Sequence, residues 1–146
     1  PASGAPMWDW MSARGSVAPA DVAQLQALHA AVLGGRKIDV AQLHDCFTLT
    51  ELLSYEDLGF IAKGAAREHI GAGTFALGGE LPVNTDGGLK AFGHPTAATG
   101  LRMVYENVLQ LQGRAGARQV AGATTALSHN IGGYPTGCAV SILSRE

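Results

Sequence analysis

Residues 87–95 read GGLKAFGHP, and this stretch places His94 on a glycine-rich turn directly before a strongly periodic helix. Glycines allow positive φ angles and a close approach of the backbone to a ligand, and Pro95 restricts the turn. The helix that follows offers its positive end and unpaired amide groups to an anion. His94 is therefore either a structural turn residue or a catalytic base, because a Gly-His-Pro tripeptide alone is compatible with both.

The composition indicates one domain with a surface that a partner covers. A chain of 146 residues is long enough to bury a hydrophobic core. Hydrophobic residues make up 47% of the sequence and charged residues only 15%, so we expect part of the surface to be an interface. The formal net charge of -2 and the lack of any Lys/Arg run argue against nucleic-acid binding.

Cysteine usage and hydropathy bear on the compartment. Cys46 and Cys138 lie far apart, without a CxxC pair or zinc-like spacing, so we expect neither a disulfide framework nor a metal site. No stretch approaches the roughly 20 apolar residues of a membrane span. The start of the sequence lacks an initiator Met and the regions of a signal peptide, so the chain looks like an excised piece. We expect a cytoplasmic protein without membrane association.

The apolar pattern predicts alternating helices and strands. We predict an irregular lead-in over residues 1–20 and one domain over residues 21–146. Predicted helices cover residues 21–33, 49–59 and 101–112, with one helical turn near 65–70, and predicted strands cover 38–43, 124–129 and 138–143. Thr48 and Glu51 have the spacing of a capping box at the start of the second helix. This order of elements predicts a three-layer α/β domain.

Three unusual segments all fall at the expected carboxyl ends of strands, where open α/β sheets bind ligands. They are the segment 44–47 (HDCF), the turn 93–95 (GHP) and the loop 130–137 (NIGGYPTG). A thiol, two imidazoles and glycine amides together could supply a proton shuttle and an oxyanion hole. Acyl transfer and carbanion chemistry beside a carbonyl need these parts.

Each part also has an ordinary structural interpretation. Cys46 could be a small buried hydrophobic residue, and His44 could cap the helix that follows it. The glycines at 132 and 133 could form a common hairpin turn rather than an anion-binding backbone. Cys138 falls where a strand packs, which favours a core residue.

Six motifs in a fixed order make the sequence recognisable. They are HDCFT (44–48), YEDLG (55–59), NTDGGLK (84–90), GHP (93–95) with ATG (98–100), LQLQG (109–113) and HNIGG (129–133). With these motifs, residues 38–143 resemble the C-terminal half of thiolases, most of all the sterol carrier protein X type. The resemblance implies a thiolase-like C-terminal domain with three α/β/α layers and a mixed sheet of about five strands. Such a half pairs with a similar N-terminal half and commonly forms dimers, so we expect a homo-oligomer.

The resemblance also implies roles for single residues. His94 would activate a nucleophilic cysteine and then help to stabilise the thioester oxyanion. His44 would contribute to the oxyanion pocket, and Cys46 would move the α-proton of acetyl-CoA. The implied oxyanion and substrate-binding residues are Gly132, Gly133 and Asn130. Coenzyme A is then expected as a substrate, with no permanently bound cofactor.

Three departures from the family pattern limit these expectations. The nucleophilic cysteine belongs to the N-terminal half, and neither cysteine of this chain lies in a matching motif, so we expect the isolated half to be inactive. Ala97 stands where the family usually has glycine. Asp86 replaces a common serine, and its carboxylate could alter the basicity of His94.

Three functions remain open from the sequence. The first is acyl transfer between acyl-CoA thioesters, by thiolysis of a 3-oxoacyl-CoA or Claisen condensation of acetyl-CoA. The second is a thiolase-like retro-aldolase, a lyase that cleaves a hydroxyacyl-CoA with an OB-fold partner. The third is a non-catalytic fragment or interaction module. Retention of His94 in its motif and of Cys46 favours the first.

Overall fold

A mixed sheet forms the centre of the computed structural model, which describes residues 37–132 and 137–145. Its strands are β1 (Val40–Leu43), β2 (Thr125–Ile131) and β3 (Cys138–Ser144), in the order β1-β2-β3. β1 runs parallel to β2, and β3 runs antiparallel to it. The predicted mixed sheet is thus confirmed, with three strands rather than about five among the described residues.

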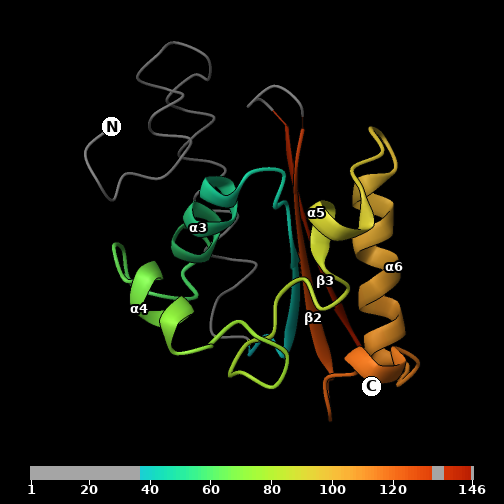
Figure 1. Ribbon diagram of the computed structural model, residues 1–146. Helices are drawn as coiled ribbons and strands as arrows, with labels where there is room; N and C mark the ends of the chain where they lie inside the picture. The colour runs from blue at the N-terminus through green and yellow to red at the C-terminus, as the bar shows by residue number, and fades with distance from the viewer. Residues whose placement is uncertain (1–36, 133–136, 146) are drawn as a thin grey trace.

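Helices cover both faces of this sheet (Figure 1). On one side lie α3 (Thr48–Asp57) and α4 (Ala66–Gly71). On the other side lie α5 (Gly88–Phe92) and α6 (Thr99–Leu111), and a 3₁₀ turn, η1 (Gly116–Arg118), follows α6. The layers therefore have the predicted α/β/α order.

Burial on both faces explains why polar and apolar side chains do not alternate along β1. Side chains of a strand point alternately to the two faces, and β1 is covered on both. Leu43 belongs to the hydrophobic cluster on the α3 side, where it is joined by Tyr55. Val40 belongs to the cluster on the α6 side with Leu111. All four residues of β1 are buried.

The start of α3 differs from the prediction. No side chain caps this helix, and its N-cap is Phe47 rather than Thr48, so the predicted capping box is wrong. The Glu51 carboxylate instead accepts hydrogen bonds from the Tyr55 hydroxyl at 2.8 Å and from the Asn84 amide at 3.1 Å. In a capping box the Glu51 carboxylate would accept a hydrogen bond from the backbone at the start of the helix. Here Asn84, which lies outside the helix, binds that carboxylate instead.

Helix α5 lies inside residues 87–95, which the sequence predicts as a glycine-rich turn. Its backbone amides are satisfied by carboxylates: Leu89 N–H donates to Asp45 Oδ1 at 2.7 Å, and Gly88 N–H donates to Asp86 Oδ1 at 3.1 Å. A Cβ atom at position 88 would lie only 2.3 Å from Asp45 Oδ2, so a glycine is required there. A carboxylate that follows β1 therefore anchors this short helix to the sheet.

Two parts of the predicted organisation lie outside the described residues. They are the lead-in of residues 1–20 and the helix predicted from Asp21. Among the helices that the structure describes, none combines the length and the apolar character needed to cross a membrane.

Candidate active site at the carboxyl edge of the sheet

His44 and Asn130 meet because β1 and β2 are parallel neighbours. Leu43 pairs with His129 in the sheet, so the residues that follow them leave the same edge side by side. His44 Nδ1 lies 2.8 Å from Asn130 Oδ1 although 86 positions separate the two residues. The His44 side chain is buried, with a relative exposure of 5%.

The turn before α6 brings a second imidazole to this edge. The rings of His44 and His94 are nearly perpendicular, at 84°, with centroids 5.0 Å apart. His94 is exposed, and its Nδ1 lies 2.7 Å from Thr99 Oγ1. The structure therefore places three sequence-predicted site residues together: His44, His94 and Asn130.

Burial favours the uncharged form of His44. Desolvation is the main cause that lowers its pKa below the usual 6.5, and a positive charge on His94 lowers it further. The hydrogen bond to Asn130 and the nearby Asp45 carboxylate oppose this shift without cancelling it. Because an amide oxygen only accepts, neutral His44 carries its proton on Nδ1 and presents an unprotonated Nε2.

Gly100 makes the close approach of Asn130 possible. A Cβ atom at position 100 would lie 2.9 Å from Asn130 Nδ2 and 3.3 Å from its Cγ. Gly100 lies in the first turn of α6, so the absence of a side chain lets this helix pack directly on the amide that holds His44.

The two thiols lie in different environments. Cys46 is half-buried just before α3, and its Sγ lies 3.9 Å from Thr50 Oγ1. Cys138 pairs with Ile131 at the start of β3, and burial raises the pKa of its thiol to about 11. Cys138 is therefore protonated at neutral pH, as expected of a structural residue.

The glycine loop is only partly described. The Gly132 amide donates to the Gly137 carbonyl at 2.6 Å and closes the β2–β3 hairpin. In this conformation the amide is not free for an oxyanion. Gly133 lies outside the described residues.

Asp86 has a partner of its own. Its carboxylate forms an ion pair with Arg102, and the two side chains are only 4% and 8% exposed. The Arg102 guanidinium also donates to Gln42 Oε1 at 3.3 Å and lies 5.0 Å from the centre of the Phe92 ring. The negative charge at position 86 is therefore compensated by Arg102.

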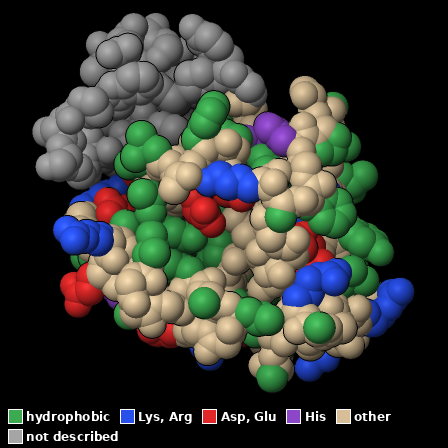
Figure 2. Space-filling model, in the orientation of Figure 1, with side chains coloured by type: hydrophobic (Ala, Val, Ile, Leu, Met, Phe, Trp, Pro, Cys, Tyr) green, Lys and Arg blue, Asp and Glu red, His purple; other side chains and the backbone are tan. Residues whose placement is uncertain are grey.

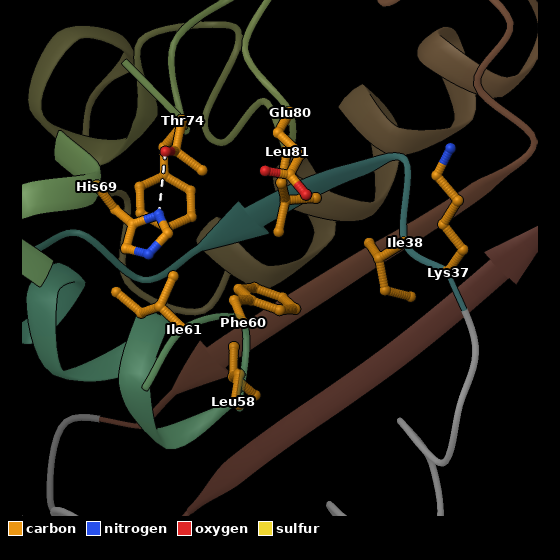
Figure 3. Close-up of a pocket in the computed structure, with 11 residues that line it drawn as sticks. Lys37, Ile38, Leu58, Phe60, Ile61, His69, Thr74, Glu80 and Leu81 are labelled. Carbon is orange, nitrogen blue, oxygen red and sulfur yellow. Dashed lines mark hydrogen bonds between the residues drawn. The ribbon is translucent and has the colours of Figure 1, made fainter. Parts of the chain in front are cut away.

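A cavity of about 280 Å³ lies near the opposite end of β1 (Figure 3). Ile38, Phe60 and His69 are among the residues that line it, and none of the predicted site residues that the structure describes does. The His69 ring faces Thr74, with Nδ1 3.1 Å from Oγ1. This cavity is separate from the cluster of His44 and His94.

Sequence reasoning assigned no role to Thr99 or Asp45. Thr99 contacts His94, and Asp45 anchors α5 beside it. Their positions in the sequence could have pointed to them. Asp45 lies between the candidate residues His44 and Cys46, and Thr99 follows His94 by five residues.

Residues 9–145 match the family described as thiolase C-terminal domain-like. The chain belongs to this family. The resemblance inferred from the six motifs is thus confirmed, and with it a thiolase-like C-terminal fold.

Known relatives of this thiolase C-terminal domain-like chain are longer than the chain itself. It is 48% identical to acetyl-CoA acetyltransferase of Methanothermobacter thermautotrophicus over 74% of its own length and 28% of the relative's. It is 47% identical to sterol carrier protein 2 of Rattus norvegicus, over 68% of its own length and 18% of the relative's.

A solved structure with the same fold is named as a different kind of enzyme, an aldolase. The "Ltp2-ChsH2(DUF35) aldolase" superposes with a TM-score of 0.66 and 30% sequence identity, and covers 82% of this chain and 30% of that chain. This chain is therefore similar both to a protein named as an acetyltransferase and to a protein named as an aldolase.

Proposed function

We propose that this chain is the C-terminal catalytic half of a thiolase, which transfers acyl groups between CoA thioesters. The observation that carries the proposal is the pair of imidazoles at the carboxyl edge of the sheet, with ring centroids 5.0 Å apart. One ring is exposed and belongs to the Gly-His-Pro turn, and the other is buried, which lowers its pKa and favours its uncharged form. The acetyl-CoA acetyltransferase named above supports the reaction class.

His94 acts first in the proposed thiolysis. It takes the proton from the thiol of a cysteine in the N-terminal half, and the thiolate attacks the 3-oxo carbonyl carbon of a 3-oxoacyl-CoA. The bond between C2 and C3 breaks, and its electron pair leaves with acetyl-CoA as an enolate. Free coenzyme A then takes the acyl group from the cysteine and regenerates the thiol.

Cys46 serves the second half of this chemistry. Its thiol gives a proton to the enolate of acetyl-CoA, and in the reverse Claisen direction its thiolate removes that α-proton. His44, Asn130, Gly132 and Gly133 belong to the proposed oxyanion and substrate pocket. His44 can donate there from Nε2 when it is charged, or when the Asn130 amide is rotated so that its NH₂ group faces Nδ1. Before the Gly132 amide can donate to an oxyanion, its hydrogen bond to the Gly137 carbonyl must break.

An exposed apolar surface supports the proposal that this half binds a partner. Phe92, Leu101 and Tyr105 are each at least 60% exposed, on α5 and α6. Hydrophobic side chains gather along the edge of the molecule over α6 (Figure 2). Exposed apolar surface of this kind is typical of an interface. The proposed partner is the N-terminal thiolase half, and the complete enzyme is proposed to be a homo-oligomer.

The test is an acylation experiment on the complete protein with its N-terminal half. Mixing with acetyl-CoA should give a burst of acyl-enzyme, and His94→Ala should suppress this burst by at least about a hundredfold in rate. His69→Ala is the matched control, because His69 lies at the separate cavity, and should leave the burst unchanged. An undiminished burst in His94→Ala would contradict the assigned role.

The aldolase named among the similar structures favours a second candidate, a retro-aldolase that cleaves a hydroxyacyl-CoA with an OB-fold partner. Thiolysis consumes free coenzyme A, whereas a retro-aldol cleavage does not. Cleavage of acetoacetyl-CoA that depends on added coenzyme A supports the thiolase. Cleavage of only a hydroxyacyl-CoA, without added coenzyme A, supports the aldolase. If the complete protein cleaves neither acetoacetyl-CoA nor a hydroxyacyl-CoA, the proposal that it is an enzyme of either kind is wrong.

A further inference from the structure

The hydroxyl of Thr99 lies between the His94 ring and the backbone of the turn. Its Oγ1 is 2.7 Å from His94 Nδ1 and 3.0 Å from the carbonyl oxygen of Pro95. A hydroxyl has one proton and a carbonyl oxygen has none, so Thr99 must be the donor in the contact with Pro95. Both hydrogen bonds therefore exist together only when His94 Nδ1 carries a proton and donates it to Thr99.

We propose that Thr99 is a positioning residue that holds neutral His94 in the tautomer with its proton on Nδ1. The Nε2 lone pair is then free to accept the proton of the nucleophile. This inference rests on the proposed function of His94 as a base, but the tautomer itself is a property of the folded chain.

The local structure fixes the hydroxyl in place. Thr99 is the first residue of α6, its side chain is buried, and its backbone N–H also donates to the Pro95 carbonyl at 3.0 Å. In the opposite tautomer Thr99 could donate to His94 Nδ1 only by giving up its bond to Pro95. One hydrogen bond of ordinary strength corresponds to about a threefold to tenfold preference for the proposed tautomer.

The same contact also suits the proton transfer. When His94 accepts a proton on Nε2, Nδ1 keeps its proton, and the bond to Thr99 persists without rotation of either side chain. A hydrogen bond that is present before and after the transfer needs no reorganisation during it. Thr99 would therefore affect the rate of acylation more than the binding of the acyl-CoA.

The chain contains a matched pair for comparison. His69 and Thr74 are also five residues apart and also make a contact from Nδ1 to Oγ1, at 3.1 Å, but they lie beside the cavity at the other end of β1. Thr74→Val makes the same chemical change as Thr99→Val away from the proposed site.

The experiment combines nitrogen NMR of the histidine rings with acylation kinetics, both on the complete protein. In the wild type, the ¹⁵N shifts of neutral His94 should report a proton on Nδ1. Thr99→Val should increase the fraction protonated on Nε2 and slow acylation by about threefold to tenfold, with little change in the KM for acetyl-CoA. Thr99→Ser should restore both readouts. Thr74→Val should change neither.

Two results would overturn the inference. The first is a wild-type His94 ring protonated on Nε2, which needs no variant and so does not depend on whether Thr99→Val folds. The second is an unchanged tautomer and acylation rate in a folded Thr99→Val protein. A failure of the proposed function looks different, because the burst would then survive His94→Ala while the wild-type ring still carried its proton on Nδ1.

Discussion

The rings of His44 and His94 lie nearly perpendicular to each other, at 84°, with the two centroids 5.0 Å apart. Two charged imidazoles at this distance would repel each other, and His44 is the one removed from water. The two rings therefore differ in their environment. His44 is buried and oriented by Asn130, which favours its neutral form, whereas His94 is exposed.

The buried His44 makes stability depend on pH. Its folded-state pKa is lowered below the usual 6.5, so below that value the unfolded chain binds more protons than the folded one. Its contribution is complete above about pH 6.5 and is lost as the pH falls toward the lowered pKa. We expect the free energy of unfolding to decrease on acidification below pH 6.5. His44→Gln should lack this part of the pH dependence in denaturant titrations, and parallel profiles would refute the assignment.

Gly100→Ala should destabilise the protein and release Asn130 from His44. The added Cβ atom would lie 2.9 Å from Asn130 Nδ2, and overpacking of this kind costs about 1–3 kcal/mol. Denaturant unfolding gives the free energy, and NMR titration of His44 should show its pKa lowered further, because the bond to Asn130 raises it.

Gly71→Ala is the matched control for Gly100→Ala. Gly71 also lies in a helix, and a Cβ atom there would have no neighbour within 4 Å. Alanine is favoured over glycine in helices, so this variant should be neutral or stabilised by up to about 1 kcal/mol. Equal effects of the two substitutions would show that the contact with Asn130 is not what requires glycine at position 100.

Ala97→Gly should stabilise the protein. Ala97 has a φ of 69°, in the left-handed region, where a Cβ atom costs about 1–2 kcal/mol. Glycine avoids this cost but loses more entropy on folding, so we expect a net gain of about 1 kcal/mol in the free energy of unfolding. Ala91→Gly in α5 is the control and should lower stability by about 0.5–1 kcal/mol. A loss of stability in Ala97→Gly would contradict the strain at this turn.

In the complete protein with its N-terminal half, Cys46→Ala should abolish exchange of the α-protons of acetyl-CoA while it spares acyl-enzyme formation. Removal of a general acid or base typically costs a hundredfold or more, on the order of 10²–10⁴. Deuterium uptake into acetyl-CoA, followed by mass spectrometry, measures the step. Cys138→Ala should exchange like the wild type, because burial raises the pKa of this thiol to about 11. Rapid exchange in Cys46→Ala would remove Cys46 from the mechanism.

Periodicity and strand order predicted most of the fold and part of the site. The apolar spacing from residue 101 to 112 predicts the helix observed as α6, and the apolar run from 38 to 43 predicts β1. The sequence placed both His44 and Asn130 at the ends of predicted strands. That β1 and β2 are parallel neighbours, which brings the two side chains together, was visible only in the structure. The position of His94 beside them required the tertiary structure.

The sequence did not predict which side chains the carboxylates bind. Glu51 has the spacing of a capping box but binds Tyr55 and Asn84. Asp86 follows no periodic pattern and pairs with Arg102, 16 positions away. A carboxylate binds whichever donor lies nearest in space, and spacing along the chain predicts that donor only within one helix or turn.

Motif order and apolar period are local properties of the chain, so they were sufficient to infer the family, the α/β/α layers and the residue types of the candidate site. The contacts of Asp45 with α5, of Asn130 with His44 and of Thr99 with His94 could be found only from the packed structure. Each of these is a directional bond about 3 Å long or shorter, whose geometry depends on how separate elements pack.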